Sequence, residues 1–131
     1  MCKENPMSVK FFKCQACGKI VEELVPSKCP TLCCGKEMVE LKANTTDATQ
    51  EKHVPVVTVD GDKVTVTVGS VIHPSEDDHY IQFIAIETEK SVQKKMLKPG
   101  EKPEAAFLLN GEKLVAAYEL CNKHGLWKKD L

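Results

Sequence analysis

The sequence lacks three features: an excess of charge of one sign, a long apolar run and an apolar leader. Its formal net charge is −1 at pH 7, so it has no basic excess with which to bind nucleic acid. No stretch approaches the roughly 18 consecutive apolar residues of a membrane-spanning helix. The charged residues at the start are not followed by an apolar run, so no signal peptide is evident. We therefore expect a cytoplasmic protein that binds neither nucleic acid nor a membrane.

The composition is that of a globular chain. Of its 131 residues, 42% are hydrophobic and 28% are charged, which argues against disorder. This length allows one ordinary domain, or one of about 80–100 residues beside a small metal-stabilised one. The seven cysteines would sit in a reducing compartment, where metal ligands and reactive thiols are commoner than disulfides.

Cysteine and histidine are concentrated in different parts of the chain. Six of the seven cysteines lie within the first 34 residues, whereas all four histidines follow residue 50. A polar stretch without apolar periodicity, residues 43–50, separates the two regions. We therefore predict two domains, residues 1–42 and 53–131, joined by a linker at residues 43–52.

Four N-terminal cysteines have the spacing of metal ligands. Cys14 and Cys17 form a C-x-x-C knuckle, and Gly18 permits the tight turn that follows. The adjacent pair Cys33 and Cys34 comes sixteen residues after Cys17. Four thiolates suit iron or zinc in a tetrahedral site, and so short a segment usually needs a metal to remain folded. A zinc ribbon is one alternative, but an adjacent pair in place of a second C-x-x-C predicts a distorted site.

Two further cysteines have no clear partner in this pattern. Cys29 lies in the same loop as Cys33 and is a competing ligand candidate, although a surface thiol is the simpler interpretation. Cys2 lies in the N-terminal tail. Neither is assigned to a metal site.

The sequence predicts β-structure throughout. In the second region, β-branched runs flank Asp60-Gly61-Asp62, a hairpin signal, and short apolar segments recur between turns. Lys113–Leu120 has some helical character, but we expect a strand there. Such a series predicts an antiparallel β-sandwich. The expected strands are Lys10–Lys13, Lys19–Val25, Glu37–Leu41, Val54–Val59, Lys63–Val68, His79–Thr88, Ser91–Leu97, Ala105–Leu109 and Lys113–Leu120.

The later region holds a second set of possible ligands. Cys121 and His124 form a C-x-x-H pair whose side chains can reach one ion, and His53, His73 and His79 lie at loops or strand edges. A single histidine is more often a surface or core residue than a ligand. Spacing alone therefore leaves open a mixed nitrogen and sulfur site or a set of ordinary histidines.

Taken in order, the motifs resemble the desulfoferrodoxin family, the two-iron class of superoxide reductases. The match covers nearly the whole chain from about residue 10, and Ile72, where proline is common, is a small departure. The motifs are C-x-x-C at Cys14–Cys17, Cys33-Cys34-Gly35, Glu51-Lys52-His53-Val54-Pro55, Val68-Gly69-Ser70-Val71-Ile72-His73-Pro74, His79-Tyr80-Ile81, Leu97-Lys98-Pro99-Gly100 and the C-N-x-H-G-L-W element at Cys121–Trp127.

The resemblance implies an all-β fold with two iron centres. A small rubredoxin- or desulforedoxin-like knuckle would precede an immunoglobulin-like antiparallel β-sandwich. Centre I would be an Fe(Cys)4 site for electron transfer, and centre II the catalytic Fe(His)4(Cys) site. The ligands implied are Cys14, Cys17, Cys33 and Cys34 for centre I, and His53, His73, His79, His124 and Cys121 for centre II.

The resemblance also implies an activity. The chain would be an enzyme that reduces superoxide to hydrogen peroxide, act as a homodimer and receive electrons from a rubredoxin-type donor. Glu51 would close onto the open position of the resting iron, and Lys52 would attract superoxide and support protonation. Zinc can replace iron in recombinant protein. The alternatives are a rubredoxin-like electron carrier and a zinc-stabilised β-sandwich binding module.

Overall fold

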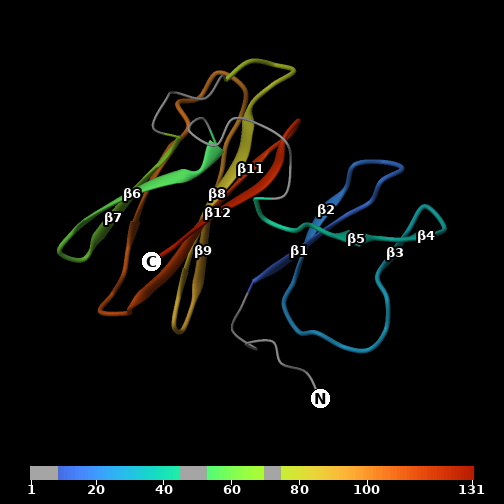
Figure 1. The fold of residues 1–131 in the computed structure, drawn as a ribbon, viewed down its shortest axis with the longest axis horizontal. Helices are drawn as coiled ribbons and strands as arrows, with labels where there is room; N and C mark the ends of the chain where they lie inside the picture. Colours follow the sequence, from blue (N-terminus) through green and yellow to red (C-terminus); the bar gives the residue numbers. More distant parts are fainter. Residues whose placement is uncertain (1–8, 45–52, 70–74) are drawn as a thin grey trace. The chain divides into compact units, whose positions relative to one another are not determined.

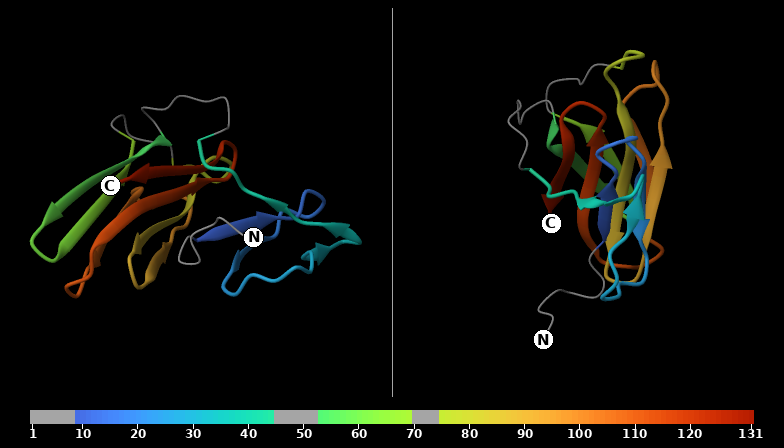
Figure 2. Two further views of the ribbon diagram at one scale, coloured as in Figure 1. Left: turned by 60° about the horizontal axis from the view of Figure 1, so that its bottom comes forward. Right: turned by 90° about the vertical axis from the view of Figure 1, so that its right-hand side faces the viewer.

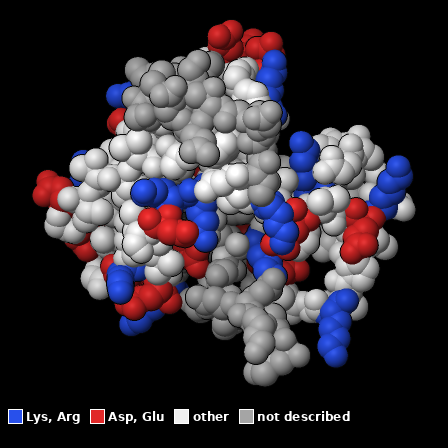
Figure 3. Space-filling view, in the orientation of Figure 1, with Lys and Arg blue, Asp and Glu red and all other residues white. Residues whose placement is uncertain are grey.

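The structure is a computed structural model of the chain, and it describes residues 9–44, 53–69 and 75–131. The chain divides into two compact units, Met1–Lys42 and Ala43–Leu131. No helix in the described part of the chain is long and apolar enough to cross a membrane. Lysine and acidic side chains are interspersed on the face that Figure 3 shows, in keeping with the net charge of −1.

The N-terminal unit is built from two small antiparallel sheets (Figure 1). One has the strand order β2-β1-β5 and the other is the hairpin β3-β4. Within this unit Phe11 and Met38 are buried, while most other described side chains are half-buried or exposed. So small an apolar core agrees with the expectation that a metal stabilises this unit. The strands are β1 Lys10–Lys13, β2 Ile20–Glu23, β3 Leu32–Cys33, β4 Lys36–Glu37 and β5 Val39–Glu40.

The C-terminal unit contains two larger antiparallel sheets, which Figures 1 and 2 show in three views. The first has the order β10-β7-β6 and the second the order β12-β11-β8-β9. Asp60 pairs with Lys63, so the predicted hairpin turn joins β6 to β7. The strands are β6 Pro55–Asp60, β7 Lys63–Val68, β8 Ile81–Thr88, β9 Val92–Met96, β10 Glu104–Leu108, β11 Leu114–Cys121 and β12 Gly125–Asp130.

One hydrophobic core is shared by these two sheets. Along β7, Val64, Val66 and Val68 are fully buried and alternate with half-buried threonines, as expected for a strand with one face in a core. They belong to the same cluster as Ile84 and Ile86 of the other sheet. Fully burying one such side chain contributes about 1.5–3 kcal/mol. The pattern is that of a β-sandwich.

An irregularity in the pairing of β8 with β11 changes which β8 side chains face this core. Leu120 pairs with Phe83 but Cys121 pairs with Ile81, so Gln82 is an extra residue on β8. This bulge brings Ile81 into the same cluster as Ile84 despite their odd spacing. It lies directly beside Cys121, at the end of the sheet where the second candidate metal site is found.

The structure confirms the predicted all-β fold class, with a cysteine knuckle module followed by a β-sandwich. The segment with some helical character is strand β11, as predicted, and it pairs with β8 on one side and β12 on the other. Strand β12 and the short strand β3 were not among the predicted strands, and β4 overlaps the predicted strand Glu37–Leu41 only at Glu37. Strand β12 begins within the C-N-x-H-G-L-W element, which sequence reasoning interpreted only as a source of ligands.

Candidate metal centres

The four N-terminal cysteines converge at one point of the N-terminal unit. The sulfur atoms of Cys14, Cys17, Cys33 and Cys34 all lie within 4.8 Å of one another. Cys14 is buried, whereas Cys17 and Cys34 are exposed, so the group lies at the surface of the unit. The structure therefore brings together the whole cysteine set predicted for the first centre.

A tight turn after β1 presents the first pair. The backbone N–H of Gly18 donates to the Cys14 carbonyl oxygen at 2.8 Å, and Gly18 adopts a φ of 83°. The N–H of Cys17 also points at the Cys14 sulfur, at 3.4 Å. Because glycine takes a positive φ without steric cost, the C-x-x-C-G sequence closes the turn with both thiols on one side.

The second pair lies at the β3-β4 hairpin. Cys33 pairs with Lys36, which leaves Cys34 and Gly35 as a two-residue turn with φ values of 54° and 71°. Two positive φ values are those of a type I′ turn, whose twist matches that of the flanking strands. Cys34 is thus held in a left-handed conformation that ordinary residues adopt only at a cost. This turn brings two adjacent sulfurs, 3.9 Å apart, to the same site.

The spacing and ionisation of these thiols fit a tetrathiolate metal site. Sulfurs bound to one ion at about 2.3 Å in a tetrahedron lie about 3.8 Å apart, and the Cys17 and Cys33 sulfurs are separated by 3.6 Å. Hydrogen bonding from the backbone N–H of Cys17 lowers the pKa of Cys14 to about 6. Hydrogen bonding to Cys14 and then Cys17 raises the pKa of Cys33 to about 12. A bound cation would therefore favour the thiolate form of Cys33, which its thiol neighbours disfavour.

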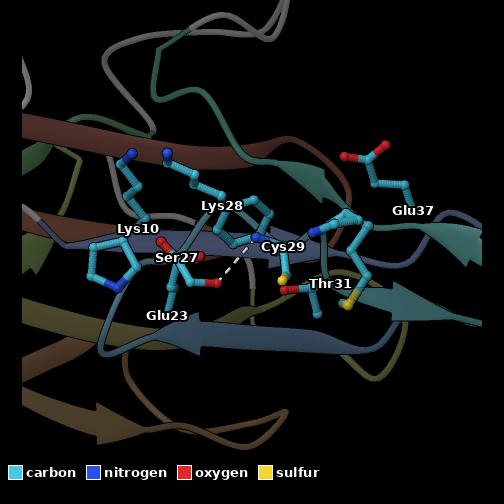
Figure 4. Close-up of a pocket in the computed structure, with 11 residues that line it drawn as sticks. Lys10, Glu23, Ser27, Lys28, Cys29, Thr31 and Glu37 are labelled. Carbon is cyan, nitrogen blue, oxygen red and sulfur yellow. Dashed lines mark hydrogen bonds between the residues drawn. The ribbon is translucent and has the colours of Figure 1, made fainter. Parts of the chain in front are cut away.

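Cys29 lies apart from this group. It is exposed, and its N–H donates to the Ser27 hydroxyl oxygen at 3.2 Å (Figure 4). The residue lines a cavity of about 600 Å³ within the N-terminal unit, together with Phe12, Pro30 and Met38. The interpretation of Cys29 as a surface thiol agrees with this position.

A second group of nitrogen and sulfur donors lies at one end of the β-sandwich. Its ligand atoms, contributed by His53, His79, Cys121 and His124, lie within 4.8 Å of one another. His53 precedes β6 of one sheet. In the other sheet, His79 precedes β8, Cys121 ends β11 and His124 precedes β12. His53 and Cys121 are buried, with 2% and 1% of their surfaces exposed. Residues far apart in sequence thus meet at the same end of both sheets.

Cys121 and His124 are presented by the hairpin between β11 and β12. Cys121 pairs with Gly125, which leaves a three-residue loop, and Gly125 has a φ of 80°. Such loops commonly end in a residue with positive φ, which glycine supplies. The turn places the Cys121 sulfur 4.0 Å from Nδ1 of His124. The C-x-x-H motif therefore forms a hairpin loop that brings the side chains of Cys121 and His124 close together.

Distances between the donors fit ligands of a single ion. Nitrogens about 2.1 Å from an ion and at right angles to each other lie about 3.0 Å apart. His124 Nδ1 and His53 Nε2 are separated by 3.0 Å. The His124 ring stands nearly perpendicular to those of His53 and His79, at 89° and 81°. Imidazole and thiolate donors suit iron, copper or zinc better than calcium or magnesium.

The ionisation of this site also favours a metal ion. Burial, followed by the nearby His124, lowers the pKa of His79 and so keeps its ring neutral, which ligation requires. Burial raises the pKa of the Cys121 thiol, while hydrogen bonds from the backbone N–H groups of Lys123 and His124 lower it. A cation bound here would stabilise the thiolate that burial disfavours.

The side chain of Asn122 joins the two loops that carry His79 and Cys121. Its Oδ1 accepts a hydrogen bond from the Tyr80 N–H at 2.9 Å, and its Nδ2 donates to the Asp78 carbonyl oxygen at 3.1 Å. Its own backbone N–H donates to the Tyr80 carbonyl oxygen at 3.2 Å. The turn before β8 is therefore attached to the hairpin after β11. The motif contained Asn122, but sequence reasoning gave it no role.

Glu119 is a buried acid two residues before Cys121, on the same face of β11. Its side chain is 0% exposed, and among the described residues its carboxyl oxygens have no hydrogen-bond partner. Burial raises its pKa well above the usual range. Sequence reasoning did not single out this residue either, because an acid in a strand usually faces water.

Three predicted site residues lie outside the described part of the chain: Glu51, Lys52 and His73. The unassigned Cys2 also lies outside it. Of the nine predicted ligands, the structure places eight, in two groups of four. The ligand roles of all nine residues, and the roles of Glu51 and Lys52, remain predictions.

Comparisons with known proteins agree with these two groups. The sequence model of the Desulfoferrodoxin family matches residues 45–130. A desulfoferrodoxin homolog of Archaeoglobus fulgidus is 43% identical over 92% of this chain and 95% of its own length. The desulfoferrodoxin of Nitratidesulfovibrio vulgaris is also 43% identical, over 95% of this chain and 98% of its own.

Solved structures give the same result. The crystal structure of the superoxide reductase from Treponema pallidum superposes with a TM-score of 0.78 at 35% identity, covering 94% of this chain and 99% of that one. The two relatives and this structure match more than nine-tenths of this chain and nearly the full length of their own. The chain belongs to the desulfoferrodoxin family.

Proposed function

We propose that this protein is a superoxide reductase that converts superoxide to hydrogen peroxide and so detoxifies it. The observation that carries the proposal is the meeting of His53, His79, Cys121 and His124 at one point. Family membership and the similarity to the Treponema pallidum superoxide reductase support it. The reaction consumes one electron and two protons for each superoxide and releases no dioxygen.

The two donor groups would hold two iron ions per chain. Centre I would be held by Cys14, Cys17, Cys33 and Cys34, and centre II by His53, His73, His79, His124 and Cys121. Iron at centre II would supply the electron to superoxide, and iron at centre I would store or relay electrons. The tetrathiol set and the histidine-rich set suit these two roles, because thiolates and neutral imidazoles stabilise different charge states of the metal.

The protein's own groups would prepare centre II for this reaction. Burial raises the pKa of Cys121, and the N–H groups of Lys123 and His124 oppose that rise by hydrogen bonding to the thiolate sulfur. Neutral imidazoles add no charge and leave the thiolate as the negative ligand. Lys52 would draw the superoxide anion inward and assist its protonation through water, and Glu51 would occupy the open position at rest.

The two units would divide the work between them. We assign residues 1–42 to an electron-transfer domain, 43–52 to a linker and 53–131 to the catalytic domain. The division of the chain between Lys42 and Ala43 supports this assignment. Asn44, at the start of the linker, is hydrogen bonded to Leu126 and Lys128 of β12.

The proposal also includes the electron donor, the oligomeric state and the location of the protein. A rubredoxin-type protein would donate electrons, and the functional assembly would be a homodimer. A cytoplasmic location suits the six described cysteines, all of which are free.

The test is metal analysis and spectroscopy of anaerobically purified protein, followed by a superoxide assay. We expect two irons per chain, the absorption of a ferric tetrathiolate, a separate thiolate-to-iron band and peroxide production without dioxygen. A rubredoxin-like electron carrier would show the first spectrum without superoxide reduction. Zinc as the only bound metal, with no activity after reconstitution with iron, would instead favour the binding module.

A further inference from the structure

Trp127 contacts two of the candidate ligands at once. Its ring stacks on that of His53, with centroids 5.1 Å apart and planes inclined by 22°. Its indole N–H donates to the carbonyl oxygen of His124 at 3.0 Å. The side chain is buried, with 1% of its surface exposed. One residue therefore touches the imidazole of the first ligand and the backbone of the last.

The backbone of Trp127 is fixed independently of any metal. It lies on β12 and pairs with Glu119 of β11, in the same ladder that joins Cys121 to Gly125. The indole therefore projects from the same rigid hairpin as Cys121 and His124. His53, by contrast, precedes β6, which belongs to the other sheet.

The stacking thus connects ligands that belong to different sheets. His53 and His124 are 71 positions apart, yet their facing nitrogens are separated by only 3.0 Å. An imidazole on a mobile rotamer would have to be ordered when a metal binds, at a cost in conformational entropy. A flat indole held against its face limits that rotation in advance.

We propose that Trp127 is a positioning residue that sets the orientation of His53 relative to His124, so that this pair of nitrogen ligands is formed before the metal binds. Its large ring restricts His53, and its N–H ties the same indole to the His124 loop. Only the expected effect of Trp127 on catalysis rests on the proposed function. Its structural part concerns how well centre II binds a metal.

Two substitutions of Trp127 distinguish its stacking on His53 from its hydrogen bond to His124. Trp127→Phe keeps a flat ring against His53 but removes the N–H donor, whereas Trp127→Leu removes both. Loss of groups that orient metal ligands typically costs about 10- to 100-fold in metal affinity. We expect Trp127→Leu to weaken ferrous iron binding at centre II by this amount and to shift the thiolate-to-iron band. Trp127→Phe should fall between it and the unaltered protein.

The control is Phe107→Leu. Phe107 is a buried aromatic of β10 in the core cluster of the same unit, so its loss tests the effect of loosening that core. The centre I absorption of each sample checks that the N-terminal unit is intact. The positioning role is wrong if Trp127→Leu retains wild-type affinity and band position. It is equally wrong if Phe107→Leu weakens centre II as much.

A second measurement needs no substitution. Trp127 is the chain's single tryptophan, so its fluorescence reports on this site alone. An open-shell ion bound by the ring on which it stacks should quench that emission strongly. Titration of iron-free protein with cobalt(II) should therefore quench emission in step with the centre II spectrum, whereas unchanged emission would contradict the stacking.

The outcome for Trp127 can be distinguished from that for the proposed function. If the unaltered protein binds iron at centre II but does not reduce superoxide, the proposed function fails. The comparison of affinities and the fluorescence titration would still decide whether Trp127 orients His53. If superoxide is reduced, the Trp127→Leu variant should lose activity in proportion to its loss of iron from centre II.

Discussion

At the scale of single residues, the candidate catalytic site depends on side chains that are not ligands. Asn122 makes two side-chain hydrogen bonds that connect the loop of His79 to the loop of Cys121. The geometry of the ligands therefore depends on contacts between loops whose sequences are more than forty residues apart. Such residues determine where the ligands lie without binding the metal themselves.

Replacing Asn122 by alanine should weaken both the fold and the site. Each hydrogen bond lost is worth about 0.5–1.5 kcal/mol, so the free energy of unfolding should fall by about 1–3 kcal/mol. The centre II band should also weaken, because the His79 turn would no longer be fixed to the hairpin. Denaturant unfolding and the visible spectrum measure the two effects.

Lys123→Ala is the matched control for this prediction. Lys123 is the next residue, and its ion pair with Asp78, at 3.8 Å, is exposed. An exposed pair contributes only about 0–1 kcal/mol, so this variant should be nearly as stable as the unaltered protein. If Asn122→Ala were no less stable than Lys123→Ala, the hydrogen bonds between the two loops would not contribute to the free energy of unfolding.

At the scale of elements, turns decide where the ligands are placed. Gly35 shows the effect of backbone conformation alone, because an added Cβ would meet no atom within 4 Å although φ is 71°. Gly35→Ala should therefore destabilise the N-terminal unit by about 1 kcal/mol through its left-handed conformation. Lys36→Ala, in the adjoining strand, should have little effect.

The measurement for Gly35 is the retention of iron by centre I. We expect the variant to release iron from centre I at a lower chelator concentration than Lys36→Ala does, while the centre II band is unchanged. Equal release from the two variants would show that the type I′ turn does not constrain Cys33 and Cys34.

A second element, the β8-β9 hairpin, is attached to the loop between β10 and β11 by Glu112. Its carboxylate accepts hydrogen bonds from the hydroxyls of Ser91, at 2.6 Å, and of Thr88. These two bonds, in that order, lower the pKa of Glu112 below its ordinary value of 4.5. The carboxylate thus stabilises the fold above the unfolded-state pKa, and that stabilisation is lost as pH falls through the folded-state pKa.

The lowered pKa of Glu112 determines how the stability should depend on pH. At neutral pH the unaltered protein should be more stable than Glu112→Gln, and the difference should shrink as the pH falls below about 4.5. Urea unfolding of both proteins at a series of pH values measures it. A difference that stayed constant down to pH 3 would mean that the carboxylate charge does not act through these hydroxyls.

The strands that the sequence predicted and those that it missed also differ at the scale of elements. Strands with regular alternation, such as β7, were predicted because a buried face imposes period two on the sequence. The strand β12, which pairs with β11 across a short hairpin, was missed because its first residues were interpreted as a ligand motif. The ligands were predictable from type and spacing, whereas the roles of Asn122 and Trp127 depend on contacts that spacing does not show.

At the scale of the whole molecule, the chain separates two kinds of metal chemistry into two units. The tetrathiol group lies in the small N-terminal unit, and the described histidines and Cys121 lie in the β-sandwich. Each unit needs a different source of stability, since the first has few buried apolar side chains and the second has an extended core. Removing metal should therefore unfold the first unit more readily than the second.

The charge of the whole molecule makes the capture of an anion depend on local cations. With a net charge of −1 and interspersed charges, the overall field gives superoxide little attraction. Lys52, beside the first histidine ligand, would then supply the steering. Lys52→Ala should lower the second-order rate constant for superoxide by about tenfold or more at low salt.

Ionic strength provides the decisive measurement for Lys52. The Debye length falls from about 30 Å at 0.01 M salt to about 8 Å at 0.15 M, so the effect of the substitution should diminish as salt is added. Pulse radiolysis of the unaltered protein, Lys52→Ala and Lys95→Ala would compare the three rates. Lys95 is exposed on β9, so its loss should change the rate little. A steering role requires that the rate of the unaltered protein fall with salt towards that of Lys52→Ala, because screening and substitution remove the same attraction.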